Sequence, residues 1–266
     1  MQPELTLMAG FLFHEVVFGP VRSRRLGLSL GVNLLPVHSK YCSFNCIYCE
    51  CGWTPPSGDH PPELPSREEV SWYLEKQLRE LQTEDYLPDA ITFAGNGEPT
   101  IHPDFPGIVE DTISLRDLYA PAAKVAILSN ASMLHHEEIF HALLRLDLNI
   151  QKLDAGSDRM FRLLNNPSEP VRITDVVHQL KRFQGKVIIQ SMFLRGMFKG
   201  ELIDNTVGDE VSQYLRHLQE ILPQLVMIYP IARATPVHTL EKIPIFTLET
   251  IADKIRAAGM KVEVYQ

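Results

Sequence analysis

The sequence predicts an α/β fold in which a parallel sheet is covered by helices. Short apolar runs, rich in β-branched and aliphatic residues and bounded by turn residues, recur along the chain. Amphipathic segments with helical periodicity lie between these runs. This alternation is typical of parallel sheets, because parallel neighbours need crossover connections. A flat doubly wound sheet and a full or partial barrel both fit, since periodicity does not separate them.

The first expected strand is "LGLSLGVNLL" (26–35), which precedes a cysteine-rich loop. Further strands are expected at 90–95, 124–130, 148–156, 186–194 and 225–231. Together with the helical segments between them, these six strands form six strand–helix units. "KVEVYQ" (261–266) is predicted as an additional strand.

The clearest expected helix is "SREEVSWYLEKQLRELQ" (66–82), where Ser66 and Glu69 form a capping box at the start. A weaker pattern lies within 104–118, where Pro106 fits only near a helix start. Other helices are expected at 135–146, 173–183, 209–222 and 247–259.

The composition is that of an ordinary globular protein. The chain has 266 residues, 45% hydrophobic and 22% charged, which fits one or two domains. The net charge of −8 argues against a protein wrapped by nucleic acid, whose phosphates favour a basic face. "RSRR" (22–25) leaves a local basic patch open: it could bind phosphate, or be a solvated turn paired with acidic helices.

The chain shows no apolar stretch of the roughly 20 residues that a membrane span needs. Its opening carries acidic Glu4 and lacks a cationic leader, so it makes a poor signal peptide. We therefore expect a cytoplasmic protein, in which cysteines serve metal binding or catalysis rather than disulfides.

All four cysteines lie in "YCSFNCIYCECG" (41–52). Zinc usually takes two separated pairs of ligands, although a local knot with His38 or His60 stays conceivable, as do unliganded buried thiols. A three-thiolate site for an iron–sulfur cluster fits better, because a cubane with three ligands keeps one iron open for chemistry. Cys51 stands too close to Cys49 to reach another corner of the same cluster, so we expect it not to be a ligand.

Functional residues should gather just after strands, at the carboxyl ends of a parallel sheet. The segments at these positions are the cysteine loop, "GNGEPT" (95–100), "SNAS" (129–132), "KLDAGS" (152–157), "QSMFLRG" (190–196) and "IYPIAR" (228–233).

"CSFNCIYC" (42–49) resembles the CxxxCxxC motif, with an aromatic residue before the last cysteine, of radical S-adenosylmethionine (radical SAM) enzymes. "GNGEPT" (95–100) looks like the glycine-rich stretch that receives the methionine amino group in that family. Longer segments across residues 18–236, which include these two motifs, are similar to the sequences of a bacterial group related to wyosine-tRNA synthetases.

This resemblance implies a partial (β/α)6 TIM-like barrel of the radical SAM type, with short N- and C-terminal extensions. It implies one domain over 1–266, with a core at 18–236 and a C-terminal helix and strand at 245–266. Cys42, Cys46 and Cys49 would hold a [4Fe–4S] cluster, and S-adenosylmethionine would bind its open iron.

The resemblance and the strand positions together suggest further contacts to S-adenosylmethionine. Gly95 and Gly97 would let the backbone approach it, and Glu98 would pair with its ammonium or hold the loop. Lys152 would meet a carboxylate and Asp154 a hydroxyl, since residues two apart on a strand share a face. A structural ion pair between the two is the alternative. The remaining candidates are Tyr48, Asn96, Ser129, Asn130, Gln190, Met192 and Ile228.

The expected function is reductive cleavage of S-adenosylmethionine to a 5′-deoxyadenosyl radical, which takes hydrogen from an unidentified substrate. The wyosine-forming enzymes carry further cysteines, and this chain has none, so their substrate is not transferred to it. An activase of a glycyl-radical enzyme and a non-catalytic iron–sulfur or zinc protein are the alternatives. The family resemblance suggests a flavodoxin or ferredoxin-like electron donor. No membrane partner is expected.

Overall fold

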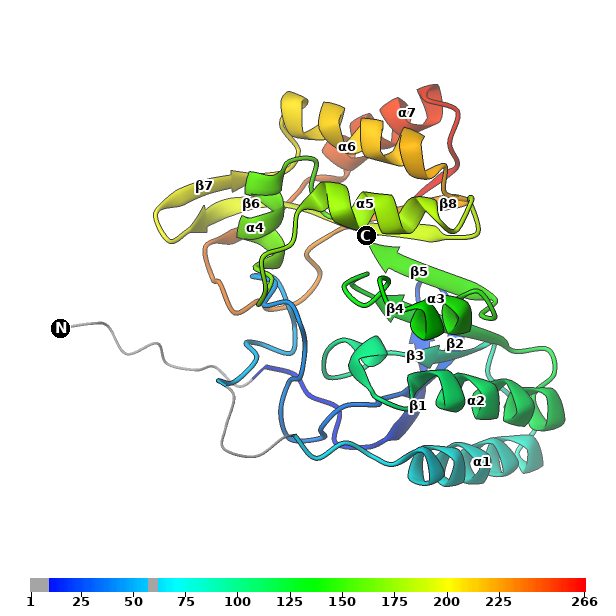
Figure 1. Ribbon diagram of the computed structural model, residues 1–266. Coiled ribbons are helices and arrows are strands. Elements are labelled where there is room, and N and C mark those ends of the chain that lie inside the picture. Colours follow the sequence, from blue (N-terminus) through cyan, green and yellow to red (C-terminus); the bar gives the residue numbers. More distant parts are fainter. Residues whose placement is uncertain (1–9, 57–61) are drawn as a thin grey trace.

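One sheet of ten strands organises the computed structural model, which describes residues 10–56 and 62–266 (Figure 1). His60 and the opening nine residues therefore lie outside the described residues. The strands are β1 (Val17–Ser23), β2 (Gly27–Val32), β3 (Ala90–Phe93), β4 (Lys124–Ser129), β5 (Leu148–Lys152), β6 (Ile188–Phe198), β7 (Glu201–Asp204), β8 (Leu225–Pro230), β9 (Leu240–Lys242) and β10 (Val262–Val264).

The strand order distinguishes between the two architectures that the pattern left open. Neighbours follow the chain as β1-β2-β3-β4-β5-β6-β8-β10, and all pairs from β2 onward along this path are parallel. A doubly wound sheet would reverse its order at a switch point, and this one does not. The edges β1 and β10 are not paired with each other, so the sheet is an open, partial barrel, as predicted.

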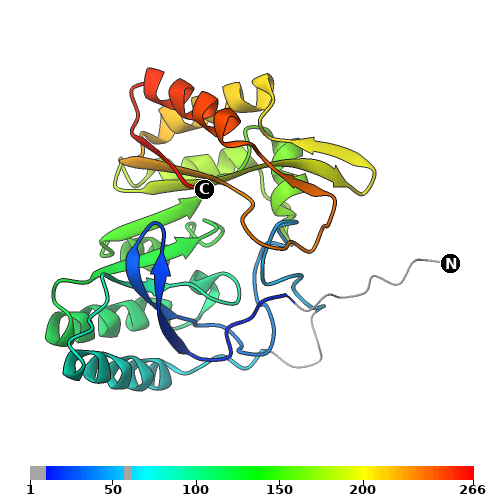
Figure 2. The ribbon, with the colours of Figure 1, turned by 180° about the vertical axis from the view of Figure 1, so that it is seen from behind.

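Seven α-helices lie on the outside of the sheet in the described residues (Figures 1 and 2). They are α1 (Arg67–Thr83), α2 (Phe105–Tyr119), α3 (Glu137–Leu143), α4 (Asp158–Asn165), α5 (Ile173–Lys181), α6 (Gly208–Ile221) and α7 (Ile245–Ala257). The expected capping box of α1 is present: Ser66 Oγ accepts from Glu69 N at 3.2 Å, and Glu69 Oε2 accepts from Ser66 N at 2.7 Å. No described helix is both long and apolar enough to cross a membrane.

Strand alternation separates an outer face, packed on helices, from an inner face toward the barrel interior. On β6 the outer side chain of Ser191 bonds Tyr214 of α6 at 2.7 Å. Ile150, Ile188 and Met227 belong instead to a separate small cluster on the inner face. The inner face is therefore the side on which polar strand-end residues can converge.

Three features lie outside the strands and helices whose ranges were expected from the sequence. β1 pairs with β2 as an antiparallel hairpin, although Gly19 and Pro20 interrupt its apolar pattern. α4 follows β5, and its first turn is capped by Ser157. β6 continues to Phe198, where it pairs with β7 and β9 beyond the barrel.

Candidate functional site

The cysteine loop leaves the carboxyl end of β2 and is bonded on one side to the glycine loop that follows β3. Tyr41 N donates to Asn96 O at 2.8 Å, and Glu98 N donates to Tyr41 O at 3.2 Å. A Cβ on Gly97 would lie 1.8 Å from Tyr41 O, so only glycine allows this approach. The two sequence stretches expected to serve the cofactor therefore lie side by side.

On its other side the cysteine loop is bonded to the end of α4. Asn45 N donates to Asn166 O at 3.0 Å, and Ile47 N donates to Leu164 O at 3.0 Å. Asn166 has a positive φ of 40°, which ends α4 and presents this carbonyl. Phe44 is buried beside these contacts, so the residues between the cysteines fix the loop in place.

Two of the three predicted ligand thiols accept amide hydrogens. Cys42 Sγ accepts from Phe44 N at 3.4 Å and from Asn130 Nδ2 at 3.6 Å. Cys46 Sγ accepts from Asn165 Nδ2 at 3.5 Å. Burial raises the pKa of both thiols, and the charge of Lys40 opposes that rise. The amide donors act in the same direction as Lys40, toward the thiolate form that binds metal clusters.

Lys40 brings a buried positive charge to the thiols. Its side chain is 3% exposed, and Nζ donates to Gly52 O at 3.0 Å. Burial lowers the pKa of Lys40, but its interactions with the nearby sulfurs, those of Cys49 and Cys42 above all, raise the pKa by more. The pKa of Lys40 therefore lies above its ordinary value. Lys40 therefore stays charged and offsets negative charge on the sulfurs.

Cys49 and Cys51 share one hydrogen bond between their sulfurs. This bond and Lys40 lower the pKa of Cys49, whereas the same bond and burial raise the pKa of Cys51. Cys51 Sγ also lies 3.5 Å from Gly95 O. Cys49 thus takes the thiolate role, and Cys51 covers the carbonyl that the family resemblance gives to the methionine amine.

Glu98 joins the loops after β3 and β4. Its carboxylate is 2% exposed and accepts from Thr100 N at 3.1 Å, Thr100 Oγ1 at 2.5 Å and Asn130 N at 2.6 Å. Burial raises the pKa of Glu98, and hydrogen bonds, including one from Ser129, oppose that rise. Of the two roles expected for Glu98, these contacts serve the one of holding the loop.

Replacing Glu98 by glutamine should therefore destabilise the fold by about 1–3 kcal/mol, because the new amide would point a donor at a buried N–H. The free energy of unfolding, measured by denaturant titration, tests this. Exposed Glu138→Gln is the control and should leave stability near the wild-type value. Equal stability of Glu98→Gln and wild type would contradict the loop-holding role.

Asn96 is also occupied by the protein. Its Nδ2 donates to Phe13 O and Pro36 O, both at 2.8 Å, and its Oδ1 accepts from Phe13 N at 2.9 Å. Asn33 Oδ1 lies against Gly95 and accepts from Asn96 N at 3.1 Å. The side chain of Asn96 therefore fastens residues on the N-terminal side of the cysteine loop.

Asp154 lies beneath the cysteine loop with a side chain that is fully buried. It accepts from Tyr48 OH, from Asn165 Nδ2 at 2.8 Å and from Met192 N at 2.8 Å. Lys152 Nζ lies 3.4 Å from its Oδ1. All of these partners belong to the protein, so Asp154 links the cysteine loop to β5 and β6.

Lys152 points into the barrel. Nζ bonds Tyr229 OH at 2.8 Å and lies 5.1 Å from the centroid of the Tyr48 ring. Burial lowers the pKa of Lys152, but Asp154 and Tyr229 raise it more, so the ammonium persists at neutral pH. Beside Lys152 on β6, Gln190 is buried with no partner for Nε2 among the described residues.

Ile228 lies on the outer face of β8, within the large apolar core, and its carbonyl accepts from Tyr265 N at 2.9 Å. Tyr229, its neighbour, faces the interior and bonds Lys152. Ser129 and Asn130 end β4 beside the cysteine loop, where Asn130 Nδ2 donates to Ser43 Oγ at 3.0 Å. The structure thus gathers most of the predicted residues around the loop and sets the Ile228 side chain apart.

Sequence reasoning missed Lys40, Asn165 and Tyr229. Lys40 stands two residues before the motif, and a cation next to clustered thiols is a usable signal. Tyr229 follows Ile228 in a segment already singled out, and strict alternation on β8 would have favoured it. Asn165 belongs to α4, which was not predicted, so no sequence signal pointed to it.

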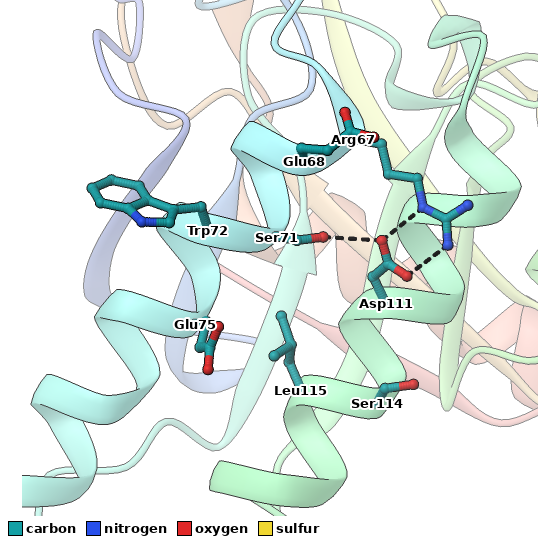
Figure 3. Close-up of a pocket in the computed structure, with 8 residues that line it drawn as sticks. All are labelled: Arg67, Glu68, Ser71, Trp72, Glu75, Asp111, Ser114 and Leu115. Carbon is teal, nitrogen blue, oxygen red and sulfur yellow. Dashed lines mark hydrogen bonds and ion pairs between the residues drawn. The ribbon is translucent and has the colours of Figure 1, made fainter.

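No group of three or more His, Cys, Asp or Glu side chains in the described part of the chain is arranged to hold a single metal ion. A hollow of about 480 Å³ lies elsewhere, between α1 and α2 (Figure 3). Arg67 and Asp111 form a bidentate ion pair on its wall, at 2.6 and 2.7 Å. None of the predicted site residues lines it.

Comparison with known proteins identifies the family. The model of the Radical SAM superfamily matches residues 37–205. A protein of Brachyspira hyodysenteriae named GTPase Obg is 31% identical over 82% of this chain and 30% of its own length. A UPF0026 protein of Methanocaldococcus jannaschii is 32% identical over 72% of this chain and 53% of its own length. The chain thus spans from under a third to about half of these relatives.

Solved structures share the fold. A radical SAM methyltransferase from Sphaerobacter thermophilus matches with a TM-score of 0.66 and 14% identity, over 89% of this chain and 65% of that one. TYW1 with a lysine-pyruvate adduct matches with a TM-score of 0.61 and 11% identity, over 86% of this chain and 73% of that one. The expected relation to wyosine-tRNA synthetases is therefore only a distant structural similarity. Because the family model covers more than half of the sequence, including the three-cysteine motif after β2, the chain belongs to the Radical SAM superfamily.

Proposed function

We propose that this protein cleaves S-adenosylmethionine at a [4Fe–4S] cluster held by Cys42, Cys46 and Cys49 and removes hydrogen from a substrate. The observation that most directly supports this proposal is that the CxxxCxxC loop is hydrogen-bonded to the glycine loop at the carboxyl end of the barrel strands. When bound, the cluster supplies an electron that splits the sulfonium and yields the 5′-deoxyadenosyl radical. The chain's residues bind, orient and shield these reactants.

The donor set fits such a cluster. Three thiolates on a [4Fe–4S]²⁺ core leave a net charge of about −1, and Lys40 supplies the matching positive charge. Amides of Phe44, Asn130 and Asn165 are already directed at thiol sulfurs. Hydrogen bonds of this kind orient cluster ligands and tune the reduction potential.

Backbone and side-chain groups around the loop suit S-adenosylmethionine. Gly95 O would accept from the methionine ammonium, in competition with the Cys51 thiol that it meets here. Ser129 and Asn130 would face its ribose hydroxyls or carboxylate. Asp154 and Glu98 act through other residues, because their oxygens are bonded within the protein.

Metal analysis after anaerobic reconstitution tests the cluster. We expect about four iron and four sulfide per chain, and an electron paramagnetic resonance signal that changes when S-adenosylmethionine is added. Zinc without sulfide would contradict the proposal. If the cluster is reducible but its spectrum does not change on addition of S-adenosylmethionine, the cluster assignment stands. The proposal that the cluster binds and cleaves S-adenosylmethionine is then contradicted.

Cys51→Ala should keep the cluster, because Cys42, Cys46 and Cys49 remain and only the thiol beside Cys49 is lost. Iron and sulfide content close to wild type is the expected result. If Cys51→Ala loses the cluster while Cys49→Ala keeps it, the ligand assignment is wrong.

A further inference from the structure

Arg25 reaches across the open side of the barrel. It lies in the turn between β1 and β2, and its guanidinium carbon is 5.0 Å from the centroid of the Tyr229 ring on β8. No ladder joins these two ends of the sheet among the described residues. Figure 2 shows the β1–β2 hairpin, in blue, on this side of the molecule, with its turn near the C-terminal strand.

Two cations therefore meet one tyrosine. Lys152 Nζ lies 5.3 Å from the centroid of the same ring and bonds its hydroxyl at 2.8 Å. Lys152 has Asp154 as a counter-ion at 3.4 Å, whereas Arg25 has neither an ion pair nor a side-chain hydrogen bond among the described residues. Half-buried and without a counter-ion, Arg25 leaves an excess of positive charge at the opening.

A third donor on the inner face also lacks a partner. Gln190 is paired in register with Lys152, is 3% exposed, and leaves Nε2 without an acceptor. Ser191, its neighbour, bonds Tyr214 on the outer face, so Gln190 faces the interior. A buried amide donor is normally hydrogen-bonded, so the unpaired Nε2 of Gln190 calls for an explanation.

Two other arginines that follow strand residues of the barrel, Arg195 and Arg233, are already paired. Arg195 bonds Glu241 at 2.7 Å, and Arg233 bonds Glu50 at 2.5 Å. Arg24 shares the turn with Arg25 but is exposed, and no ion pair involves it in the described residues. Arg25 is thus distinguished from these residues both by its position over Tyr229 and by its lack of a counter-ion.

We propose that Arg25, Lys152, Gln190 and Tyr229 form a subsite for an oxyanion, a carboxylate or phosphate, of a small-molecule substrate that enters through the open side. All four side chains offer hydrogen-bond donors, and a guanidinium fork with an ammonium matches the geometry and charge of such a group. This rests on the proposed function and deepens it, because Lys152 also neighbours Tyr48 of the cysteine motif. An anchored oxyanion would hold the rest of the substrate near the cluster loop.

Calorimetric titration of the cluster-containing protein, saturated with S-adenosylmethionine, tests this subsite. Inorganic phosphate and malonate are the probes, at constant ionic strength set with sodium chloride. At least one should bind saturably, and comparison of the two identifies the preferred oxyanion. Arg25→Gln should weaken binding about 10-fold or more, as for the loss of a charge-assisted hydrogen bond.

Arg24→Gln is the matched control, because it removes the same charge from the same turn without the contact to Tyr229. It should bind the anion as wild type does. Gln190→Leu should weaken binding without changing net charge, which separates a built subsite from general attraction. Circular dichroism checks that each variant is folded.

Three results would overturn the inference: neither probe binds, Arg24→Gln weakens binding as much as Arg25→Gln, or the probe displaces S-adenosylmethionine. The last would mean that the donors serve the cofactor's own carboxylate. The proposed function fails on different evidence, namely a wild-type protein that does not cleave S-adenosylmethionine. Intact cleavage without anion binding contradicts this inference alone.

Discussion

Cys46→Ala is expected to lose the iron–sulfur cluster and, with it, cleavage of S-adenosylmethionine. Cys46 is the most buried of the three predicted ligands and lies at the centre of the motif. With two thiolates left, a cubane would have two open irons and would not be held stably. Iron and sulfide should fall from about four per chain to near zero after the same reconstitution.

The fold itself should survive this change. Cys46 is one small side chain, and the loop keeps its backbone bonds to α4 and to the glycine loop. Far-ultraviolet circular dichroism therefore serves as the check. A folded Cys46→Ala protein that retains a full cluster and still forms 5′-deoxyadenosine would refute the ligand assignment.

Asp154→Ala is expected to be the most destabilising single change at the site, by about 3–5 kcal/mol, because it leaves the Lys152 charge buried without its partner. It also removes the acceptor for Tyr48 OH and for Met192 N. The loss of the Tyr48 bond should loosen the cysteine loop. Denaturant unfolding measures the stability, and iron content after reconstitution measures the loop.

The double variant Lys152→Met with Asp154→Asn separates charge from packing. Removing both charges together should cost less than Asp154→Ala alone, because no uncompensated ion remains. Asp175→Ala, which breaks the exposed ion pair with Arg172, is the surface control and should leave stability nearly unchanged. If Asp154→Ala were as mild as this control, Asp154 would not link the loop to β5 and β6.

Much of the barrel was predictable because local patterns decide it. The runs at 90–95, 124–130 and 225–231 became β3, β4 and β8, since each is short, apolar and bounded by turn residues. Their order and closure were not predictable from periodicity. The sheet order, without a reversal, is a long-range property that only the pairing of strands reveals.

In the site, too, features set by local sequence were predictable and those set by long-range contacts were not. The three-cysteine spacing and the glycine loop are contiguous in sequence, so they could be found before the fold was known. Several partners of Asp154 and Glu98 come from distant elements, so the sequence did not identify them. For Glu98 it offered two roles, pairing with the cofactor's ammonium or holding the loop, and did not decide between them. Asn165 supplies a hydrogen-bond donor to Cys46 through tertiary packing, which no motif encodes. Lys40, which supplies a charge to the thiols, is by contrast a local feature two residues before the motif.

Quantifying 5′-deoxyadenosine tests the central claim most directly. The protein, reconstituted anaerobically and reduced with dithionite, is incubated with S-adenosylmethionine beside the Cys46→Ala protein treated in the same way. We predict 5′-deoxyadenosine from the wild-type protein well above the Cys46→Ala control. No excess over that control, from a protein whose cluster is present and reduced and whose spectrum does not respond to S-adenosylmethionine, would contradict the account.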